Sequence, residues 1–243
     1  MRDWNGKRYW LVGASEGLGL AVAQRLSRMG VEVILSARSE DRLKELAAEM
    51  PGQAQAVVVD VSDPKAVEMA WNEIGEIDGF VYLAGYYEPM KAQDWQGEQV
   101  ERMIDINLTG AMRCLAHVAP DFAKRGTGHI VLTGSLSAYR GLPGAIGYSA
   151  SKAAMASLAE SIYIDLFRSG VEVQVIHPGY IRTRLTDKND FSMPQIMEPE
   201  KAAEYFVDHM ASGTFEKAYP APFAWFFRLC TIMPNWLYLR IFR

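Results

Sequence analysis

The chain has 243 residues, 49% of them apolar, with a formal net charge of −4 and a pI of about 5.6. This size and apolar content predict one globular domain with a large core and exclude a disordered chain, and the absence of Lys/Arg blocks argues against a nucleic-acid partner. Two cysteines and four histidines stand at spacings unlike those of metal ligands, and residues 1–6 hold no apolar signal core, so we expect no metal site and a cytoplasmic protein.

The first motif of the chain is a glycine-rich turn between a strand and a helix. Residues 7–12 predict a strand, and apolar side chains from Leu20 to Met29 have helical spacing. The turn between them reads Gly13-Ala14-Ser15-Glu16-Gly17-Leu18-Gly19. Glycines let the backbone approach a pyrophosphate, and the helix N-terminus offers free N–H groups, so we expect a dinucleotide here. The spacing differs from that of a phosphate-transferring ATPase loop, and the alternative is a turn without a ligand.

The rest of the chain alternates strand-like apolar runs with helix-like segments. This alternation predicts a Rossmann-like, doubly wound parallel sheet in a three-layer α/β/α domain, with right-handed crossovers. Further strands are expected at residues 31–36, 56–59, before Ala84, at 129–133 and at 171–176. Helices are expected at residues 40–50, 64–74, 99–124 with an interruption near Pro120, and 148–168 with Gly170 at its end.

A serine, a tyrosine and a lysine follow the fifth apolar run. Tyr148 and Lys152 are one helical turn apart and share a face, and Ser135 precedes them. A free tyrosine titrates near pH ~10, and a neighbouring ammonium favours the phenolate, so we expect Lys152 to lower the Tyr148 pKa. This arrangement predicts proton exchange with an alcohol or a carbonyl compound. A second copy of the spacing, from Tyr87 to Lys91, contains Pro89, which would break a helix. The alternative for Tyr148 is an ordinary surface pair.

These motifs, in this order, resemble the classical short-chain dehydrogenase/reductase family over residues 7–186. Four further positions match the pattern of that family: Asp60-Val61, Ala84-Gly85, Asn107 and Pro178-Gly179. One position departs from it, because the usual Asn-Asn-Ala-Gly is replaced by Tyr82-Leu83-Ala84-Gly85. Leu83 cannot make the hydrogen bonds of an asparagine, so we expect the packing there to differ.

The resemblance implies a role for each matching residue. Hydride transfer between a nicotinamide and a substrate carbon would be accompanied by proton transfer at Tyr148, with Ser135 bound to the substrate oxygen, Lys152 on the cofactor ribose and Asn107 holding a water. The implied catalytic residues are Asn107, Ser135, Tyr148 and Lys152. The implied cofactor-binding residues are Gly13, Ser15, Gly17, Leu18, Gly19, Arg38, Ser39, Asp60, Val61, Ala84, Gly85, Tyr148, Lys152, Pro178, Gly179, Ile181 and Thr183.

The choice of nicotinamide nucleotide is expected to depend on the residues after the second strand. An acidic residue there would accept hydrogen bonds from the adenosine ribose, but this chain has Ala37 followed by Arg38 and Ser39. The guanidinium fork of Arg38 suits a 2′-phosphate. We therefore predict a preference for NADP(H), with NAD(H) as the alternative. Glu16 argues against this preference, and a solvated Arg38 at a helix start is the competing interpretation.

The last segment, residues 218–243, has an unusual composition. It contains eight aromatic residues and three arginines but no acidic residue. Pro222 and Pro234 predict two short helices, and the apolar runs are too short to span a bilayer. We therefore divide the chain into a nucleotide-binding domain with its own substrate site, residues 1–217, and an amphipathic tail, residues 218–243. The tail either lies on a membrane surface or packs over the substrate pocket or a neighbouring subunit.

Substrate contacts are expected from residues 86–88, 137–147 and 184–197, and the aromatic residues Tyr86, Tyr87 and Tyr180 favour a bulky or hydrophobic carbonyl compound or alcohol. By resemblance, the helices at 99–124 and 148–168 pair between subunits, which implies a homodimer or homotetramer. Two other functions remain open. A non-catalytic nucleotide sensor on the same fold would be favoured by loss of Tyr148 or Lys152, and both are present. A sugar-nucleotide epimerase of the extended branch is disfavoured by the glycine spacing and the chain length.

Overall fold

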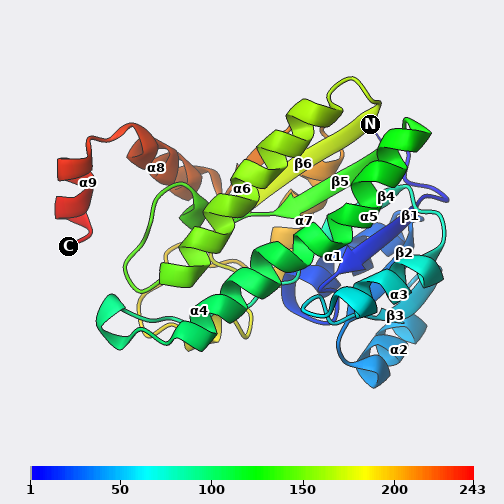
Figure 1. The fold of residues 1–243 in the computed structure, drawn as a ribbon, viewed down its shortest axis with the longest axis horizontal. Helices are drawn as coiled ribbons and strands as arrows, with labels where there is room; N and C mark the ends of the chain where they lie inside the picture. Colours follow the sequence, from blue (N-terminus) through cyan, green and yellow to red (C-terminus); the bar gives the residue numbers. More distant parts are fainter. Residues whose placement is uncertain (1) are drawn as a thin grey trace.

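Seven parallel strands form the central sheet, in the order β3-β2-β1-β4-β5-β6-β7 (Figure 1). The computed structural model describes residues 2–243. The strands are β1 (Arg8–Val12), β2 (Glu32–Ala37), β3 (Ala54–Val58), β4 (Gly79–Tyr82), β5 (Gly128–Thr133), β6 (Val171–Pro178) and β7 (Glu216–Tyr219). The order reverses between β1 and β4, and in open α/β sheets a ligand binds at the carboxyl ends of the strands beside such a reversal.

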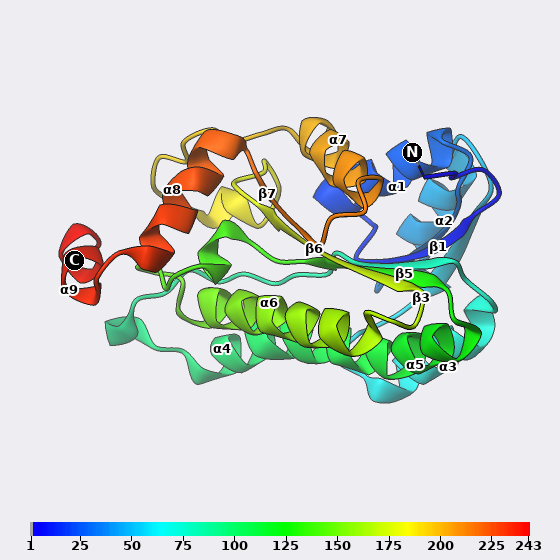
Figure 2. The same ribbon diagram turned by 90° about the horizontal axis from the view of Figure 1, so that it is seen from above.

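Helices cover both faces of the sheet (Figure 2). One face carries α1 (Gly17–Arg28), α2 (Glu40–Glu49) and α7 (Pro199–Met210). The other carries α3 (Pro64–Ile74), α4 (Gly97–Ile104), α5 (Gly110–Arg125) and α6 (Ile146–Leu166). The tail forms α8 (Ala221–Ile232) and α9 (Asn235–Ile241), and short 3₁₀ turns lie at Ala92–Asp94, Leu136–Ala138 and Thr186–Lys188. The predicted three-layer, doubly wound fold is confirmed.

The alternation of side chains along β1 builds both halves of the core. Tyr9 and Leu11 pack on the α1 side, while Trp10 and Val12 pack on the α5 side, as the period of two in a strand requires. All four are buried, which explains why a strand covered on both faces reads as a continuous apolar run. The indole of Trp10 donates a hydrogen bond of 2.9 Å to the Ser36 hydroxyl on β2, so its polar atom is satisfied inside the core.

The crossovers between strands do not all have the same hand. The steps from β4 to β5, β5 to β6 and β6 to β7 run in one direction across the sheet. The first two pass through α5 and α6 on one face, but the third passes through α7, which packs beside α1 on the opposite face (Figure 2). The expectation of right-handed crossovers throughout is therefore wrong, because a crossover on the opposite face reverses the hand.

Two boundaries differ from expectation in ways that matter for the site. The long helix at 99–124 is interrupted by a π-helical turn at Asp105–Thr109, not near Pro120, which lies inside an unbroken α5. The tail is divided into two helices as predicted, with Pro222 in the first turn of α8 and Pro234 as the N-cap of α9. Strand β7 crosses the expected domain boundary at 217–218, so the tail continues directly from the sheet.

The buried His129 makes the stability of the fold depend on pH. Its ring lies between the Tyr9 hydroxyl at 2.9 Å and the Gln174 side-chain oxygen at 2.8 Å, and burial lowers its pKa from 6.5 to about 3. Below pH 6.5 the unfolded chain takes up a proton here that the folded chain does not. The stability that this residue contributes is therefore present above pH 6.5 and is lost as the pH falls towards 3.

We expect the His129→Gln variant to have a shallower loss of stability in acid than the wild type. Between these two pKa values the difference in slope should be about 1.4 kcal/mol per pH unit, corresponding to one proton. Urea unfolding at a series of pH values measures both slopes. Equal slopes in the two proteins would show that His129 does not titrate in this way.

Candidate active site

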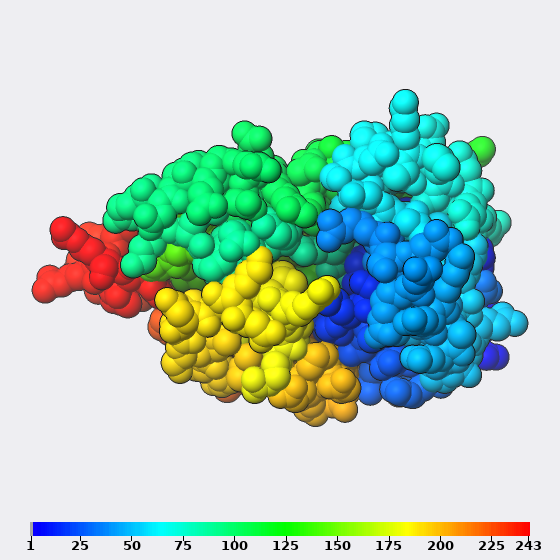
Figure 3. Space-filling view, turned by 90° about the horizontal axis from the view of Figure 1, so that it is seen from below, coloured from blue at the N-terminus to red at the C-terminus, as the bar shows by residue number. Residues whose placement is uncertain are grey.

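Two cavities meet at the carboxyl ends of the central strands. The first, of about 360 Å³, runs along the glycine-rich turn to Ser135 and Tyr148, and the second, of about 430 Å³, continues from the same two residues toward the tail. Figure 3 shows the face on which the yellow segment after β6 meets the blue N-terminal half. The first cavity is lined by every residue predicted to bind a cofactor and by three of the four predicted catalytic residues, Ser135, Tyr148 and Lys152.

The glycine-rich turn has the shape required of a phosphate cradle. Gly13 and Gly17 have φ values of +93° and +52°, which disfavour residues with a side chain. A Cβ atom on Gly13 would collide with the backbone of Ala84, and one on Gly19 would collide with the carbonyl of Gly13. Helix α1 begins at Gly17, so its free N–H groups lie in the wall of the cavity. The turn therefore fits the pyrophosphate of a dinucleotide.

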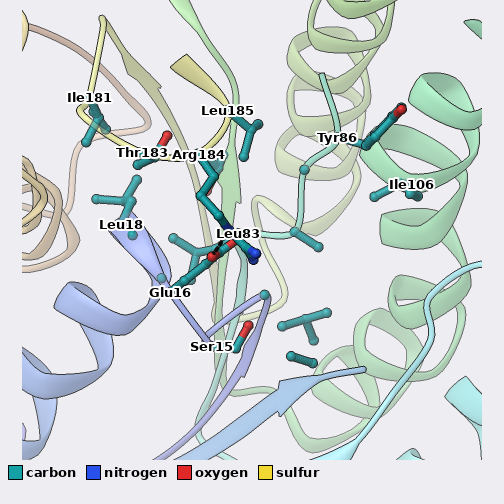
Figure 4. A pocket seen from close by; sticks show the side chains of 18 of the residues that line it. Ser15, Glu16, Leu18, Leu83, Tyr86, Ile106, Ile181, Thr183, Arg184 and Leu185 are labelled. Atoms are coloured by element: carbon teal, nitrogen blue, oxygen red, sulfur yellow. Dashed lines mark ion pairs between the residues drawn. The ribbon is translucent and has the colours of Figure 1, made fainter. Parts of the chain in front are cut away.

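The far end of the first cavity contains the residues expected to select the nucleotide. Arg38 and Ser39 follow β2 and are exposed, while Ser15 lies in the turn opposite them. Glu16 forms an ion pair with Arg184 across the opening (Figure 4). Figure 4 also shows Thr183 and Leu185 on the same side as Arg184, so the segment after β6 covers the cradle.

The side chains of Lys152, Tyr148 and Ser135 lie where the two cavities join. Lys152 is buried and donates a hydrogen bond of 2.9 Å to the carbonyl of Thr133, the last residue of β5. Its Nζ atom lies 5.7 Å from the centre of the Tyr148 ring, as expected for side chains one helical turn apart. The ring of Tyr148 also packs edge-on against Tyr87, with 5.1 Å between ring centres.

The pKa of Tyr148 shifts in the direction opposite to our expectation. Burial raises it, and the neighbouring Ser135 hydroxyl offsets this only in part. Lys152 does not lower it, because burial brings the Lys152 pKa down to about 8 and the ammonium therefore loses its proton before the phenol does. The expected acidic phenol is therefore wrong for this arrangement. Tyr148 is held protonated near pH 7, as a proton donor must be.

Asn107 lies apart from the cavities, within the π-helical turn. Its side-chain oxygen accepts a hydrogen bond of 2.6 Å from the N–H of Tyr86, and its amide donates to the Tyr86 carbonyl and the Ser151 hydroxyl, both at 3.0 Å. Ser151 in turn donates to the carbonyl of Tyr148 at 2.8 Å. Asn107 thus connects the loop after β4 to the first turn of α6.

The second cavity is enclosed by the tail as well as by the expected substrate segments. Tyr87, Leu142 and Phe191 line it, in agreement with the predicted contacts from residues 86–88, 137–147 and 184–197, and Tyr180 lines it as well. Tail side chains complete the lining, as in the alternative in which the tail packs over the substrate pocket: Phe223, Phe226, Phe227 and Phe242. The cavity is consequently apolar, apart from the hydroxyl and amide groups of a few residues.

A polar chain that the sequence did not reveal connects the tail to Ser135. Burial lowers the pKa of His177 to about 4, and its Nδ1 lies 3.2 Å from the Ser135 nitrogen and 3.1 Å from the Ser135 carbonyl oxygen, so the tautomer of the ring decides which of the two it bonds. The opposite nitrogen of the ring faces the Glu216 carboxylate at 3.7 Å. Glu216 accepts a hydrogen bond from Tyr139 and pairs with Arg228 of α8 at 3.4 Å. His177 occupies the space that a side chain at Gly134 would need.

Comparison with known proteins now identifies the family. The sequence model described as short chain dehydrogenase matches residues 7–192. The chain belongs to the short-chain dehydrogenase family. It is an oxidoreductase that acts on alcohol or carbonyl groups with a nicotinamide dinucleotide.

Relatives of this short-chain dehydrogenase cover nearly its full length. An uncharacterized oxidoreductase of Myxococcus xanthus is 36% identical over 98% of this chain and 97% of its own. Another, from Staphylococcus haemolyticus, is 32% identical over 85% and 92% of the two chains. Among solved structures, a short-chain dehydrogenase from Sphingobium yanoikuyae in complex with NADPH has a TM-score of 0.81 at 27% identity, over 94% and 97% of the two chains.

We expect the Arg228→Met variant of this dehydrogenase to turn over more slowly, because Glu216 then loses a partner and holds His177 less firmly against Ser135. The decrease in kcat should be about fivefold, the equivalent of about 1 kcal/mol. Arg228→Lys should retain part of the activity, and Arg240→Met, at an exposed arginine of α9, is the matched control. Steady-state kinetics measure these values, and an unchanged kcat in Arg228→Met would contradict the connection.

Proposed function

We propose that the protein catalyses the NADPH-dependent reduction of a hydrophobic ketone. One observation carries this proposal: Ser135 and Tyr148 line both the cavity that fits a dinucleotide and the apolar cavity next to it. A substrate carbonyl in the second cavity can therefore contact the Ser135 hydroxyl and the Tyr148 phenol while it faces the end of the first cavity. The four phenylalanines of the tail favour an apolar body next to that carbonyl.

The residues at the junction divide the chemistry between them. Tyr148 donates its proton to the carbonyl oxygen, and the raised pKa of this phenol keeps it in the protonated donor form near neutral pH. The Ser135 hydroxyl donates a hydrogen bond to the same oxygen and stabilises the negative charge that develops on it. Lys152 supplies a positive charge near the phenol and can bind ribose hydroxyls. A water that returns the proton would bind the main chain of the π-helical turn, since the Asn107 side chain already has protein partners.

The first cavity fits NADP(H) by charge as well as by shape. When bound, the nicotinamide supplies the hydride that the substrate carbon receives. The turn from Gly13 to Gly19 would hold the pyrophosphate, Asp60 and Val61 would flank the adenine, and Ile181 and Thr183 would contact the carboxamide. Arg38 would bind the 2′-phosphate. The objection from Glu16 is weakened, because its negative charge is matched by Arg184.

We also infer a homodimer or homotetramer in a reducing compartment such as the cytoplasm. The helices α5 and α6 leave the apolar side chains of Met112 and Ile164 uncovered on their outer faces, and Phe167, directly after α6, is exposed as well. Apolar exposure of this kind supports pairing with the same helices of a second subunit. Cys114 and Cys230 are both buried and unpaired, which supports a reducing environment.

The Tyr148→Phe variant tests the reaction. It removes only the proton donor, so kcat for ketone reduction should fall by about 10²- to 10⁴-fold while NADPH still binds. Stopped-flow absorbance follows turnover, and quenching of protein fluorescence follows NADPH binding. Tyr163→Phe, on the same helix but half-buried against the core, is the matched control. Full activity of Tyr148→Phe would refute the assignment and favour a nucleotide sensor.

The Arg38→Gln variant tests the choice of nucleotide. Loss of the guanidinium should weaken NADPH binding about tenfold, or about 1.4 kcal/mol, because the 2′-phosphate loses a charged partner. NADH lacks that phosphate, so its affinity should stay the same and serves as the internal control. Equal affinities of the variant and the wild type for NADPH would place the 2′-phosphate elsewhere.

A further inference from the structure

The outer surface of the tail is apolar and exposed. Trp225, Leu229 and Ile232 follow one another at helical spacing on one face of α8, and Trp225 and Ile232 are 68% and 79% exposed. Trp236 and Leu239 form the corresponding stripe on α9, where Trp236 is 69% exposed. Both helices protrude from one end of the molecule (Figures 1 and 3). Large side chains gathered in this way mark an interaction surface.

The opposite side of the same helices is fixed to the body. Arg140 donates to the carbonyls of Cys230 and Met233 at the end of α8, at 3.0 and 3.3 Å, and its guanidinium stacks on Tyr238 of α9 at 4.1 Å. The Tyr238 hydroxyl donates to the Gly141 carbonyl at 2.6 Å. Because these contacts hold both helices in place, the exposed stripes are a built surface of the folded protein.

The charge of the tail decides which partner fits. Residues 218–243 contain no acidic side chain, and Arg240 and Arg243 are exposed at the end of the chain. A protein partner would need an apolar patch bordered by acids, whereas an anionic bilayer supplies both apolar depth and negative headgroups along its whole surface. Tryptophan side chains favour the boundary between the two. We propose that α8 and α9 dock on an anionic lipid bilayer.

Docking would place the apolar cavity next to lipid. No helix among residues 2–243 is long and apolar enough to cross a membrane, so the tail would lie in the interface plane. Phe226 of α8 and Phe242, directly after α9, line the cavity. This step rests on the proposed function. For a ketone reductase docked in this position, the substrate class that suits the site is a carbonyl group on a long acyl chain, taken from the bilayer.

Vesicle sedimentation with the full-length protein tests docking without any need for turnover. The wild type should bind anionic vesicles made of an equimolar mixture of phosphatidylcholine and phosphatidylglycerol. It should bind only weakly to vesicles of phosphatidylcholine alone. Arg240→Gln/Arg243→Gln should reduce partitioning about 25-fold at low salt, since each arginine near the surface contributes about fivefold. Trp225→Ser/Trp236→Ser should reduce it by more than about tenfold.

Controls at the opposite end of the molecule separate docking from general stickiness. Met69→Ser on α3 removes an apolar side chain that is 71% exposed, and Arg42→Gln on α2 removes a charge, so both should bind as the wild type does. Circular dichroism checks that every variant is folded. Equal partitioning of wild type and tryptophan variant, or a change of oligomeric state by light scattering in that variant, would overturn the proposal, the latter in favour of a subunit interface.

Activity assays then distinguish this proposal from the proposed function. Reduction of a short, water-soluble ketone should be the same in the wild type and in Trp225→Ser/Trp236→Ser. Reduction of a long-chain keto lipid presented in the anionic vesicles should fall in that variant in proportion to its loss of binding. Bilayer docking with no turnover of either ketone would refute the reductase and leave docking standing.

Discussion

The bond between the Lys152 ammonium and the Thr133 carbonyl is the interaction on which the site depends. A buried charge is stable only with a partner, and here the partner is the last carbonyl of the central strand β5. The bond fixes α6 against the end of the sheet, and Tyr148, one turn earlier, then faces both cavities. Asn107 holds the same turn from the other side through its hydrogen bond to Ser151. Two polar contacts therefore fix the position of α6.

Local chemistry explains why much of this could be predicted from the sequence. The turn from Gly13 to Gly19 has to be glycine-rich, because backbone atoms occupy the space of any side chain there. Tyr148 and Lys152 are neighbours in any helix that contains both. The continuous apolar runs of β1 and its successors specify a sheet that is buried on both faces. Each of these constraints acts over a few residues, and such constraints can be read directly from a sequence.

The features that the sequence did not reveal depend on contacts between distant segments. His177, Glu216 and Arg228 form one polar chain only because β6 and β7 are paired and α8 follows β7. No residue of the π-helical turn at Asp105–Thr109 marks an interruption in the sequence as clearly as a proline does, which is why the interruption was expected near Pro120 instead. The direction of the Tyr148 pKa was mistaken for a related reason: spacing indicates which groups are neighbours, but the burial of both groups determines their pKa values.

The tail illustrates how one segment can serve two sides at once. Its aromatic side chains are more numerous than those needed to pack against the core. Two helices this short are also only marginally stable by themselves. Phenylalanines on the inner side close the substrate cavity, while tryptophans on the outer side remain uncovered. Arg228 points inward to Glu216 and Tyr139, so a displacement of α8 would be felt at His177 and Ser135. Because the cavity wall and the exposed surface belong to the same helices, a contact on the outside necessarily bears on the shape of the site within.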